Sequence, residues 1–334
     1  MLKKRDSKYE LLRIISILLI IASHYSNYGN WYSQTRLTSF FDPFGKVGVD
    51  LFIMISGWFL SVEVFDLKKM IKRISKLWLW VIFYTWSILL IDYFIRFEKI
   101  TLKSIIHNVF PMLFNEYWFV TSFLVLMFLV PLLNKMVKFL SQKQLIIYIF
   151  IFLVGSSILP LINHSNPPME VNGVGIMITS YLSAAYLKKY DLKKTNNWIL
   201  PLIMIVSLVL QYVLNKGHNG IMSFVIAFPI FVLFTKINSF YSNIVNFIAS
   251  SVFASYLITE NELIRIPLWH KWLNVGQYSD NPILPGILIT ICLICVTVLI
   301  DKIYKLCYGV FIVKFKEKLD NYIFPKCQFK LEKK

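Results

Sequence analysis

The stretch YELLRIISILLIIASHYSNY, residues 9–28, is a largely apolar run that contains one arginine and one histidine. A helix needs about 20 mostly apolar residues to cross the hydrocarbon core of a bilayer. Nine further runs of similar character follow, at residues 47–65, 77–95, 117–134, 144–160, 171–187, 198–214, 219–235, 244–260 and 282–301. The sequence therefore predicts an all-α integral membrane protein with about ten transmembrane helices.

The composition agrees with a membrane protein and excludes both a soluble globular protein and a disordered chain. Hydrophobic residues make up 57% of the 334 residues and charged residues 16%, whereas soluble domains carry about 25% charged residues. Disorder is excluded because it requires low hydrophobicity. The net charge of +17 would suggest a nucleic-acid partner for a soluble protein. In a membrane protein cationic cytoplasmic loops explain this charge, so we expect no nucleic-acid partner.

The distribution of positive charge predicts the orientation in the lipid bilayer. Lysine and arginine accumulate on the side of the membrane that is not translocated. With the N-terminus inside, the predicted inner segments hold 26 of the 35 Lys and Arg residues, and the outer loops hold 8. We therefore expect both termini to be cytoplasmic.

The chain is predicted to form one transmembrane domain, residues 1–301, followed by a basic tail, residues 302–334. The tail mixes aromatic residues with lysines, so it lies on the anionic inner leaflet or is solvated. The first span contains Glu10, Arg13 and His24 and precedes nine others, which argues against a cleavable signal peptide. The sequence shows neither the paired repeats nor the broken helices that are typical of transporters.

Cysteine usage does not indicate a metal or redox site. Cys292 and Cys295 have the CxxC spacing, but they lie inside an apolar run. We expect them to face lipid or the protein core rather than to bind zinc. No nucleotide-binding loop occurs in the sequence. The sequence thus predicts no metal and no bound cofactor.

Arg13 and His24 share one face of the first predicted span. Eleven residues separate them, and at about 100° per residue this is about 20° past three full turns. The rise between them is roughly 16 Å. With the N-terminus inside, Arg13 lies near the cytoplasmic surface and His24 near the outer end. They mark a polar stripe through most of the bilayer, or they are two separate interfacial residues.

Three acidic residues lie at the predicted outer ends of other spans, at the depth of His24. They are Asp50 in span two, Glu116 in span four and Glu260 in span nine. A carboxylate beside a histidine fixes the tautomer of the imidazole and raises its basicity. Asp50 is therefore a candidate partner of His24, or alternatively an interfacial residue paired with Lys46.

Polar and aromatic residues near the same depth are candidates for an acceptor site. They are Ser56, Trp118, Tyr256 and Glu260. The alternative for Ser56 and Gly57 is that small side chains allow two helices to approach closely. The alternative for Trp118 is an ordinary interfacial aromatic residue. This pattern fits a group-transfer enzyme, a transporter or an ion pathway.

Four segments together resemble a known family. They are YELLRIISILLIIASH (9–24) with its Arg-x10-His pattern, KVGVDLFIMISGWFL (46–60), NEYWFVTSFLVLMFLVPLLNK (115–135) and ASSVFASYLITENELIR (249–265). In this order and topology the chain resembles membrane-bound acyltransferase family 3. The closest resemblance is to the bacterial polysaccharide O-acetyltransferases.

The resemblance implies an O-acyltransferase of the bacterial cell membrane. The donor would be cytoplasmic acyl-CoA, most simply acetyl-CoA, acting as a substrate rather than as a bound cofactor. The acceptor would be a hydroxyl of a cell-surface polysaccharide, such as a capsule or exopolysaccharide, or of its lipid-linked precursor. His24 would be the catalytic residue, as a general base or as a carrier of the acyl group.

The resemblance also implies roles for residues around His24. Arg13 would bind the CoA, and Asp50 or Glu116 would orient His24. Arg73 and Lys76 in the inner loop could add contacts to the nucleotide, although their charge is also explained by topology alone. The sequence departs from the family at Thr259, where many relatives have histidine. Our hypothesis is that this histidine tunes the acceptor side in relatives.

Three other readings stay open. The protein could be a non-catalytic transporter of a glycan intermediate or of acyl groups. It could be a component of polysaccharide export or modification whose enzymatic role is only inferred. It could also use another donor such as succinyl-CoA, which would need an extra cation near the outer site. Arg265 is the one evident candidate for that cation, and it lies in a predicted loop.

Overall fold

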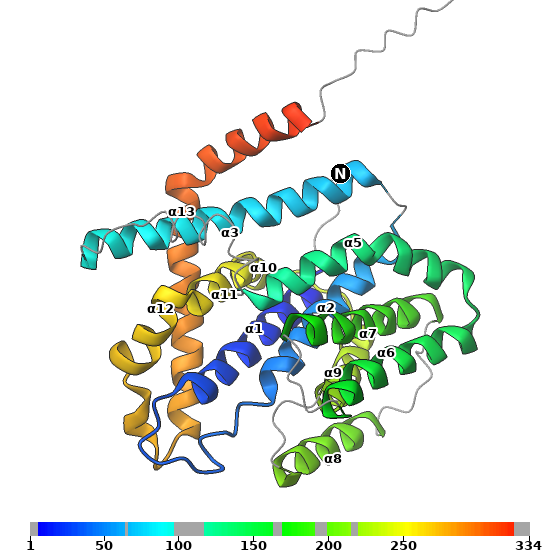
Figure 1. Ribbon diagram of the computed structural model, residues 1–334, viewed down its shortest axis with the longest axis horizontal. Helices are drawn as coiled ribbons and strands as arrows, with labels where there is room; N and C mark the ends of the chain where they lie inside the picture. The colour runs from blue at the N-terminus through cyan, green and yellow to red at the C-terminus, as the bar shows by residue number, and fades with distance from the viewer. Residues whose placement is uncertain are drawn as a thin grey trace, which may run out of the picture.

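The structure is a computed structural model that describes residues 6–63, 66–96, 117–162, 169–190, 199–214 and 220–323. Every regular element in these ranges is helical, as the all-α prediction requires (Figure 1). The helices are α1 (Ser7–Tyr28), α2 (Phe44–Leu60), α3 (Leu67–Arg96), α5 (Trp118–Phe139), α6 (Gln142–Ile162), α7 (Met169–Tyr190), α8 (Ile199–Leu214), α9 (Gly220–Lys236), α10 (Asn243–Ala249), α11 (Val252–Glu260), α12 (Glu262–Pro267), η1 (Leu268–Trp272), η2 (Val275–Tyr278) and α13 (Ile283–Ile323).

Each predicted span coincides with helix in the structure, but the helices differ in length. In the described part of the chain, four helices are long and apolar enough to cross a membrane by length and composition, namely α1, α3, α5 and α13. Shorter apolar helices lie in α6, α8 and α9. The protein is an integral membrane protein, while the count of ten spans and the orientation stay predictions.

The ninth predicted span, residues 244–260, is broken into α10 and α11. The sequence predicted one continuous helix here, and the structure shows that this prediction is wrong. The two serines at the break, Ser250 and Ser251, are residues that compete for backbone hydrogen bonds and so favour helix ends. Lys305 of α13 donates to the carbonyl oxygen of Ser250 at 2.9 Å, which satisfies a group that the break exposes.

The centre of the bundle is α2, which packs between α1, α7 and α9 (Figure 1). Glycines allow this close packing. A Cβ atom on Gly57 would lie 2.5 Å from the carbonyl oxygen of Tyr181 in α7, and one on Gly48 would meet the carbonyl oxygen of Ser16 in α1. Gly57 is therefore a helix-packing residue, as one reading of the sequence proposed.

The start of α1 is fixed to the loop after α9. The backbone amide of Ser7 donates to the carbonyl oxygen of Phe240 at 2.9 Å. The ammonium group of Lys8 donates to the carbonyl oxygens of Thr235 and Ile237, at the C-terminal end of α9. A cation there interacts favourably with the helix dipole. The contact places the start of α1 and the end of α9 next to each other, and their cytoplasmic location stays a prediction.

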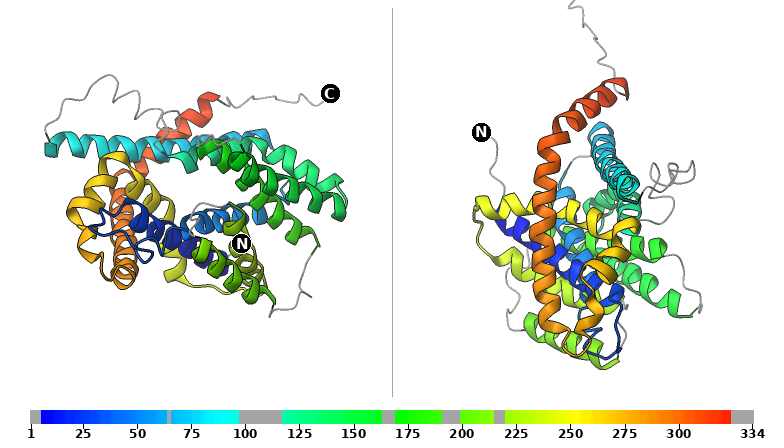
Figure 2. Two further views of the ribbon diagram at one scale, coloured as in Figure 1. Left: turned by 60° about the horizontal axis from the view of Figure 1, so that its bottom comes forward. Right: turned by 90° about the vertical axis from the view of Figure 1, so that its left-hand side faces the viewer.

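Helix α13 continues beyond the boundary drawn at residue 301. It runs without interruption to Ile323, and its second half turns away from the rest of the molecule (Figures 1 and 2). The first part of the tail is therefore helical, whereas residues 324–334 lie outside the described residues. Within α13, Asp301 is fully buried and forms an ion pair with Lys305 at 2.6 Å. The hydroxyl of Tyr84 in α3 also donates to Asp301.

Candidate active site

His24 and Glu260 form a buried pair between α1 and α11. The Nδ1 atom of His24 lies 3.2 Å from Oε1 of Glu260, and the two side chains are 12% and 2% exposed. His24 occupies the fifth position from the end of α1, and Glu260 is the last residue of α11. Two helices that are far apart in the sequence therefore bring a base and a carboxylate together in a water-poor environment.

Two further residues hold the other oxygen of Glu260. The Nη1 atom of Arg265 lies 3.7 Å from Oε2, and the hydroxyl of Tyr28 donates to the same atom at 3.5 Å. The guanidinium of Arg265 also lies over the ring of Tyr28, 4.8 Å from its centroid. The Tyr28 ring is in turn 5.4 Å from the His24 ring. Glu260 is thus held on both sides, and its orientation toward His24 is fixed.

This arrangement is suited to acid–base chemistry at His24. The two atoms lie within ion-pair distance without forming a hydrogen bond of ordinary geometry. A carboxylate on this side of the ring favours the proton on Nδ1, which leaves Nε2 to exchange a proton with a substrate. Arg265 places a positive charge 3.7 Å from the same carboxylate and offsets part of its negative charge. The sequence analysis did not single out Tyr28, and it considered Arg265 only as a cation for an acidic acyl group. Arg265 was expected in a loop, but it belongs to α12 and is committed to Glu260.

Asp50 does not serve as the partner of His24 in the structure. It is fully buried in α2, and its Oδ1 atom accepts a hydrogen bond from Ser180 of α7 at 2.7 Å. Glu260, rather than Asp50, lies at Nδ1 of His24, and a role of Asp50 in orienting His24 stays a prediction. Depth in the membrane alone does not determine which neighbouring helix a side chain faces. Glu116, the other candidate, lies outside the described residues.

Arg13 is paired within its own helix. Its Nη1 atom lies 2.7 Å from Oε1 of Glu10, one turn earlier, and its side chain is 31% exposed. Arg13 thus pairs with a carboxylate of its own helix, whereas His24 contacts Glu260 of α11. The exposed guanidinium leaves Arg13 able to contact an anion as well.

Arg73 and Lys76 of α3 both line a cavity of about 310 Å³. The remaining lining is mainly apolar and comes from the end of α2 and from α3, α5 and α11, with Leu60, Ile74, Leu77, Trp80, Phe123, Met127 and Phe253. The sequence expectation that the two cations lie together is consistent with this cavity. An elongated ligand with an anionic end and a less polar arm fits such a lining.

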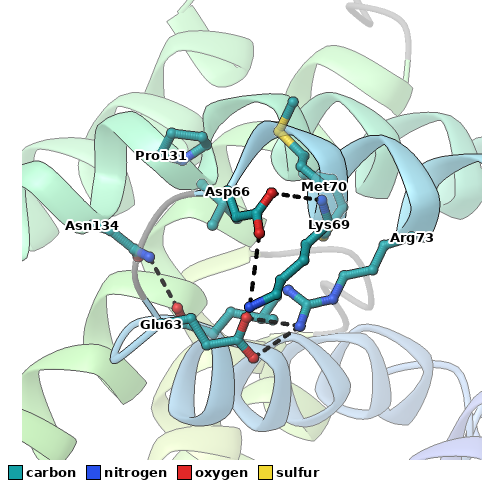
Figure 3. Close-up of a pocket in the computed structure, with 10 residues that line it drawn as sticks. Glu63, Asp66, Lys69, Met70, Arg73, Pro131 and Asn134 are labelled. Atoms are coloured by element: carbon teal, nitrogen blue, oxygen red, sulfur yellow. Dashed lines mark hydrogen bonds and ion pairs between the residues drawn. The ribbon is translucent and has the colours of Figure 1, made fainter. Parts of the chain in front are cut away.

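Arg73 is also bound by an acidic residue. Oε1 of Glu63 accepts a hydrogen bond from Nη2 of Arg73 at 2.9 Å, and Oε2 lies 2.7 Å from the same nitrogen as an ion pair (Figure 3). These two residues line a second, smaller cavity next to the first, together with Asp66 and Lys69, which form their own pair at 3.8 Å. Arg73 therefore lies between the two cavities, with its charge engaged by Glu63.

A series of aromatic rings leads from the larger cavity to Glu260. Phe123 of the cavity wall stacks on Phe119 with a centroid separation of 5.8 Å. Phe119 in turn meets the ring of Tyr256 edge-on at 5.4 Å. Tyr256 lies one turn before Glu260 on α11. The cavity and the His24–Glu260 pair are thus connected through α5 and α11.

The other acceptor-site candidates have local roles. The hydroxyl of Ser56 donates to the carbonyl oxygen of Phe52 in its own helix. The ring of Trp118 packs at Gly173 of α7, where a Cβ atom would lie 3.1 Å from it. Thr259 is buried and donates to the carbonyl oxygen of Ser255. Among these candidates, the structure brings Glu260 into direct contact with His24.

The described residues contain no cluster of three or more His, Cys, Asp or Glu side chains that could hold a metal ion.

Residues 6–301 match the acyltransferase domain that defines acyltransferase family 3. The match covers most of the chain, and the protein belongs to this family of membrane acyltransferases. Comparison with curated proteins and with solved structures gives no match.

Proposed function

We propose that the protein transfers an acetyl group from cytoplasmic acetyl-CoA to a hydroxyl of a cell-surface polysaccharide or of its lipid-linked precursor. The observation that carries this proposal is the buried contact between His24 and Glu260 inside an acyltransferase domain. A buried, oriented histidine is the group that acyl transfer to a hydroxyl requires, because the hydroxyl must lose its proton as it attacks.

In the proposed reaction His24 acts as the general base. Its Nε2 atom takes the proton of the acceptor hydroxyl as the oxygen attacks the carbonyl carbon of the thioester. The carbon–sulfur bond then breaks, and the same proton passes from His24 to the sulfur of CoA. Glu260 stabilises the imidazolium that exists between the two proton transfers. No net proton is released, and His24 returns to its starting state.

The donor would bind from the side of α3. Arg73 and Lys76 supply cations for the phosphates, and the apolar wall with Trp80 and Phe253 accommodates part of the arm. Arg13 would add a contact nearer the acyl end of the donor along α1. Replacing Arg13 with alanine should then raise KM for acetyl-CoA while changing kcat little. A fall in kcat at unchanged KM would remove Arg13 from the donor site.

A transporter is the second candidate, and the broken ninth span favours it. Half-helices that end within a membrane form ion and substrate sites in many transporters. Here the break at Ser250 is bridged by Lys305 and Lys302, which satisfy its carbonyl and its hydroxyl. We favour the enzyme because the buried His24–Glu260 pair lies away from this break, at the other end of α11.

The test uses purified protein in detergent with radiolabelled acetyl-CoA and oligosaccharide acceptors. Wild-type protein should transfer label to the sugar, and His24→Ala should lose about 10²–10⁴-fold in kcat. In cells, NMR of the surface polysaccharide should lose one set of O-acetyl signals when the gene is removed, at normal polymer yield. An unchanged acetyl pattern with less polymer outside would support the transporter instead.

A further inference from the structure

We propose that Tyr256 is a catalytic residue whose hydroxyl donates a hydrogen bond to the carbonyl oxygen of the acyl donor. This inference rests on the proposed acyl-transfer function and adds a group that stabilises negative charge. Such a group is needed because attack on the thioester places a negative charge on that oxygen, and His24 cannot serve as base and oxyanion donor together.

The position of Tyr256 follows from the geometry of α11. Phe253, Tyr256 and Glu260 fall within about 60° of arc on the helix at about 100° per residue. Phe253 lines the larger cavity, and Glu260 contacts His24. One face of α11 thus leads from the cavity to the catalytic pair, and Tyr256 lies between the two.

The hydroxyl of Tyr256 is buried without a hydrogen-bond partner in the described part of the chain. The amide of Phe119, in the first turn of α5, approaches it without forming a hydrogen bond of ordinary geometry. Leaving a hydroxyl unpaired in the interior is costly, and buried polar groups in native proteins are nearly always paired. A hydroxyl that stays unpaired beside a reactive site is available to a ligand.

The neighbouring Tyr117 shows that this environment can satisfy a tyrosine hydroxyl. Its ring centroid lies 6.0 Å from that of Tyr256. The Tyr117 hydroxyl donates to the carbonyl oxygen of Leu257 at 3.2 Å and accepts from the amide group of Asn261 at 2.9 Å. Of two adjacent buried tyrosines, one is therefore committed to the fold and the other is not.

The ring of Tyr256 is held in place by its neighbours. Phe119 meets it edge-on and Tyr117 packs beside it, so the hydroxyl has a fixed direction before a ligand binds. A donor that is positioned in advance stabilises developing charge without reorganisation during the reaction. In the step that we propose, the hydroxyl keeps its proton and only shares it with the carbonyl oxygen. The atoms and electrons balance as in the transfer described above.

The test compares Tyr256→Phe with Tyr117→Phe as a matched control. Each variant removes one buried hydroxyl and keeps the ring. Tyr256→Phe should lower kcat by about 10²–10³-fold, raise KM for acetyl-CoA by no more than about tenfold, and leave the melting temperature unchanged. Tyr117→Phe should lower the melting temperature, because it breaks two hydrogen bonds, and should retain kcat. A Tyr256→Phe enzyme with wild-type kcat would overturn the proposal.

A binding measurement separates hydrogen bonding to the carbonyl from a structural effect. Acetonyl-CoA keeps the carbonyl group but cannot transfer its acyl group, and S-ethyl-CoA lacks the carbonyl. Tyr256→Phe should lower the affinity for acetonyl-CoA about two- to tenfold and leave the affinity for S-ethyl-CoA unchanged. If Tyr256→Phe binds acetonyl-CoA as tightly as the wild-type protein does, Tyr256 does not contact the carbonyl group. If wild-type protein transfers no acetyl group, the proposed function fails first and this inference fails with it.

Discussion

The imidazole of His24 and the carboxylate of Glu260 lie 3.2 Å apart, and each belongs to a different end of the family domain. Glu260 contacts Tyr28 and Arg265 with its second oxygen. The pair is therefore part of a small network whose members restrain one another. Loss of any single member should change the ionisation or orientation of His24 more than the overall fold.

The first prediction concerns Glu260. Replacement by glutamine keeps the size of the side chain but removes the charge that stabilises the imidazolium. We expect kcat to fall by at least about tenfold, because the imidazolium that forms during transfer loses the carboxylate that stabilises it. The measurement is kcat for acetyl transfer at fixed pH, with thermal unfolding as the control for folding. Wild-type kcat in Glu260→Gln would separate this carboxylate from catalysis.

The second prediction concerns the ion pair between Glu63 and Arg73. If Arg73 binds donor phosphates, Glu63 competes with the donor for the same guanidinium. Glu63→Gln should then lower KM for acetyl-CoA by a fewfold, because the competing charge is removed. Asp66→Asn is the matched control, since Asp66 lies in the same small cavity but pairs with Lys69. Equal changes in both variants would point to a general effect of charge rather than to Arg73.

The third prediction concerns the contact between α2 and α7. Gly57→Ala places a methyl group 2.5 Å from the carbonyl oxygen of Tyr181, so the helices must separate. Overpacking of this kind costs about 1–3 kcal/mol, and the melting temperature in detergent should fall. Gly155→Ala in α6 is the control, because a Cβ atom there meets no atom within 4 Å. If both variants melt at the wild-type temperature, the close approach of the two helices is not required.

The fourth prediction concerns Asp301 and Lys305. Lys305→Met removes the cation from a fully buried carboxylate and from the carbonyl oxygen of Ser250 at the helix break. Breaking a buried pair from one side costs about 3–5 kcal/mol, and because Lys305 is partly exposed we expect the lower part of this range. Adding Asp301→Asn should recover part of the lost stability. Thermal unfolding of the single and double variants tests this, and a double variant less stable than Lys305→Met would contradict it.

Much of the architecture could be predicted from the sequence, because long apolar runs have few alternatives to helix in a membrane. The pairing of His24 could not, for a physical reason. The sequence placed Asp50, Glu116 and Glu260 at a similar depth, but the direction in which each faces depends on how the helices pack around α2. The break at Ser250 was also missed, since two serines within an apolar run are a weak signal.

Glycines at the helix contacts explain in part why Asp50 faces away from His24. Gly48 and Gly57 allow α1 and α7 to lie close to α2, which directs Asp50 toward Ser180. Sequence reasoning recognised that Gly57 permits close approach but could not say which helix would approach. The pairing of Arg265 with Glu260 could have been inferred, because an arginine five residues after a glutamate is within reach of it when the chain turns at Asn261.

The contact between His24 and Glu260 has a consequence for biogenesis. During synthesis His24 enters the membrane with the first helix, and its carboxylate partner is added only near the end of the chain. At about 5–20 residues per second, the ribosome takes on the order of tens of seconds to reach Glu260. On the proposed mechanism, the nascent protein during that time holds a base without its counter-charge. A product that stops before Glu260 would then be inert rather than partly active.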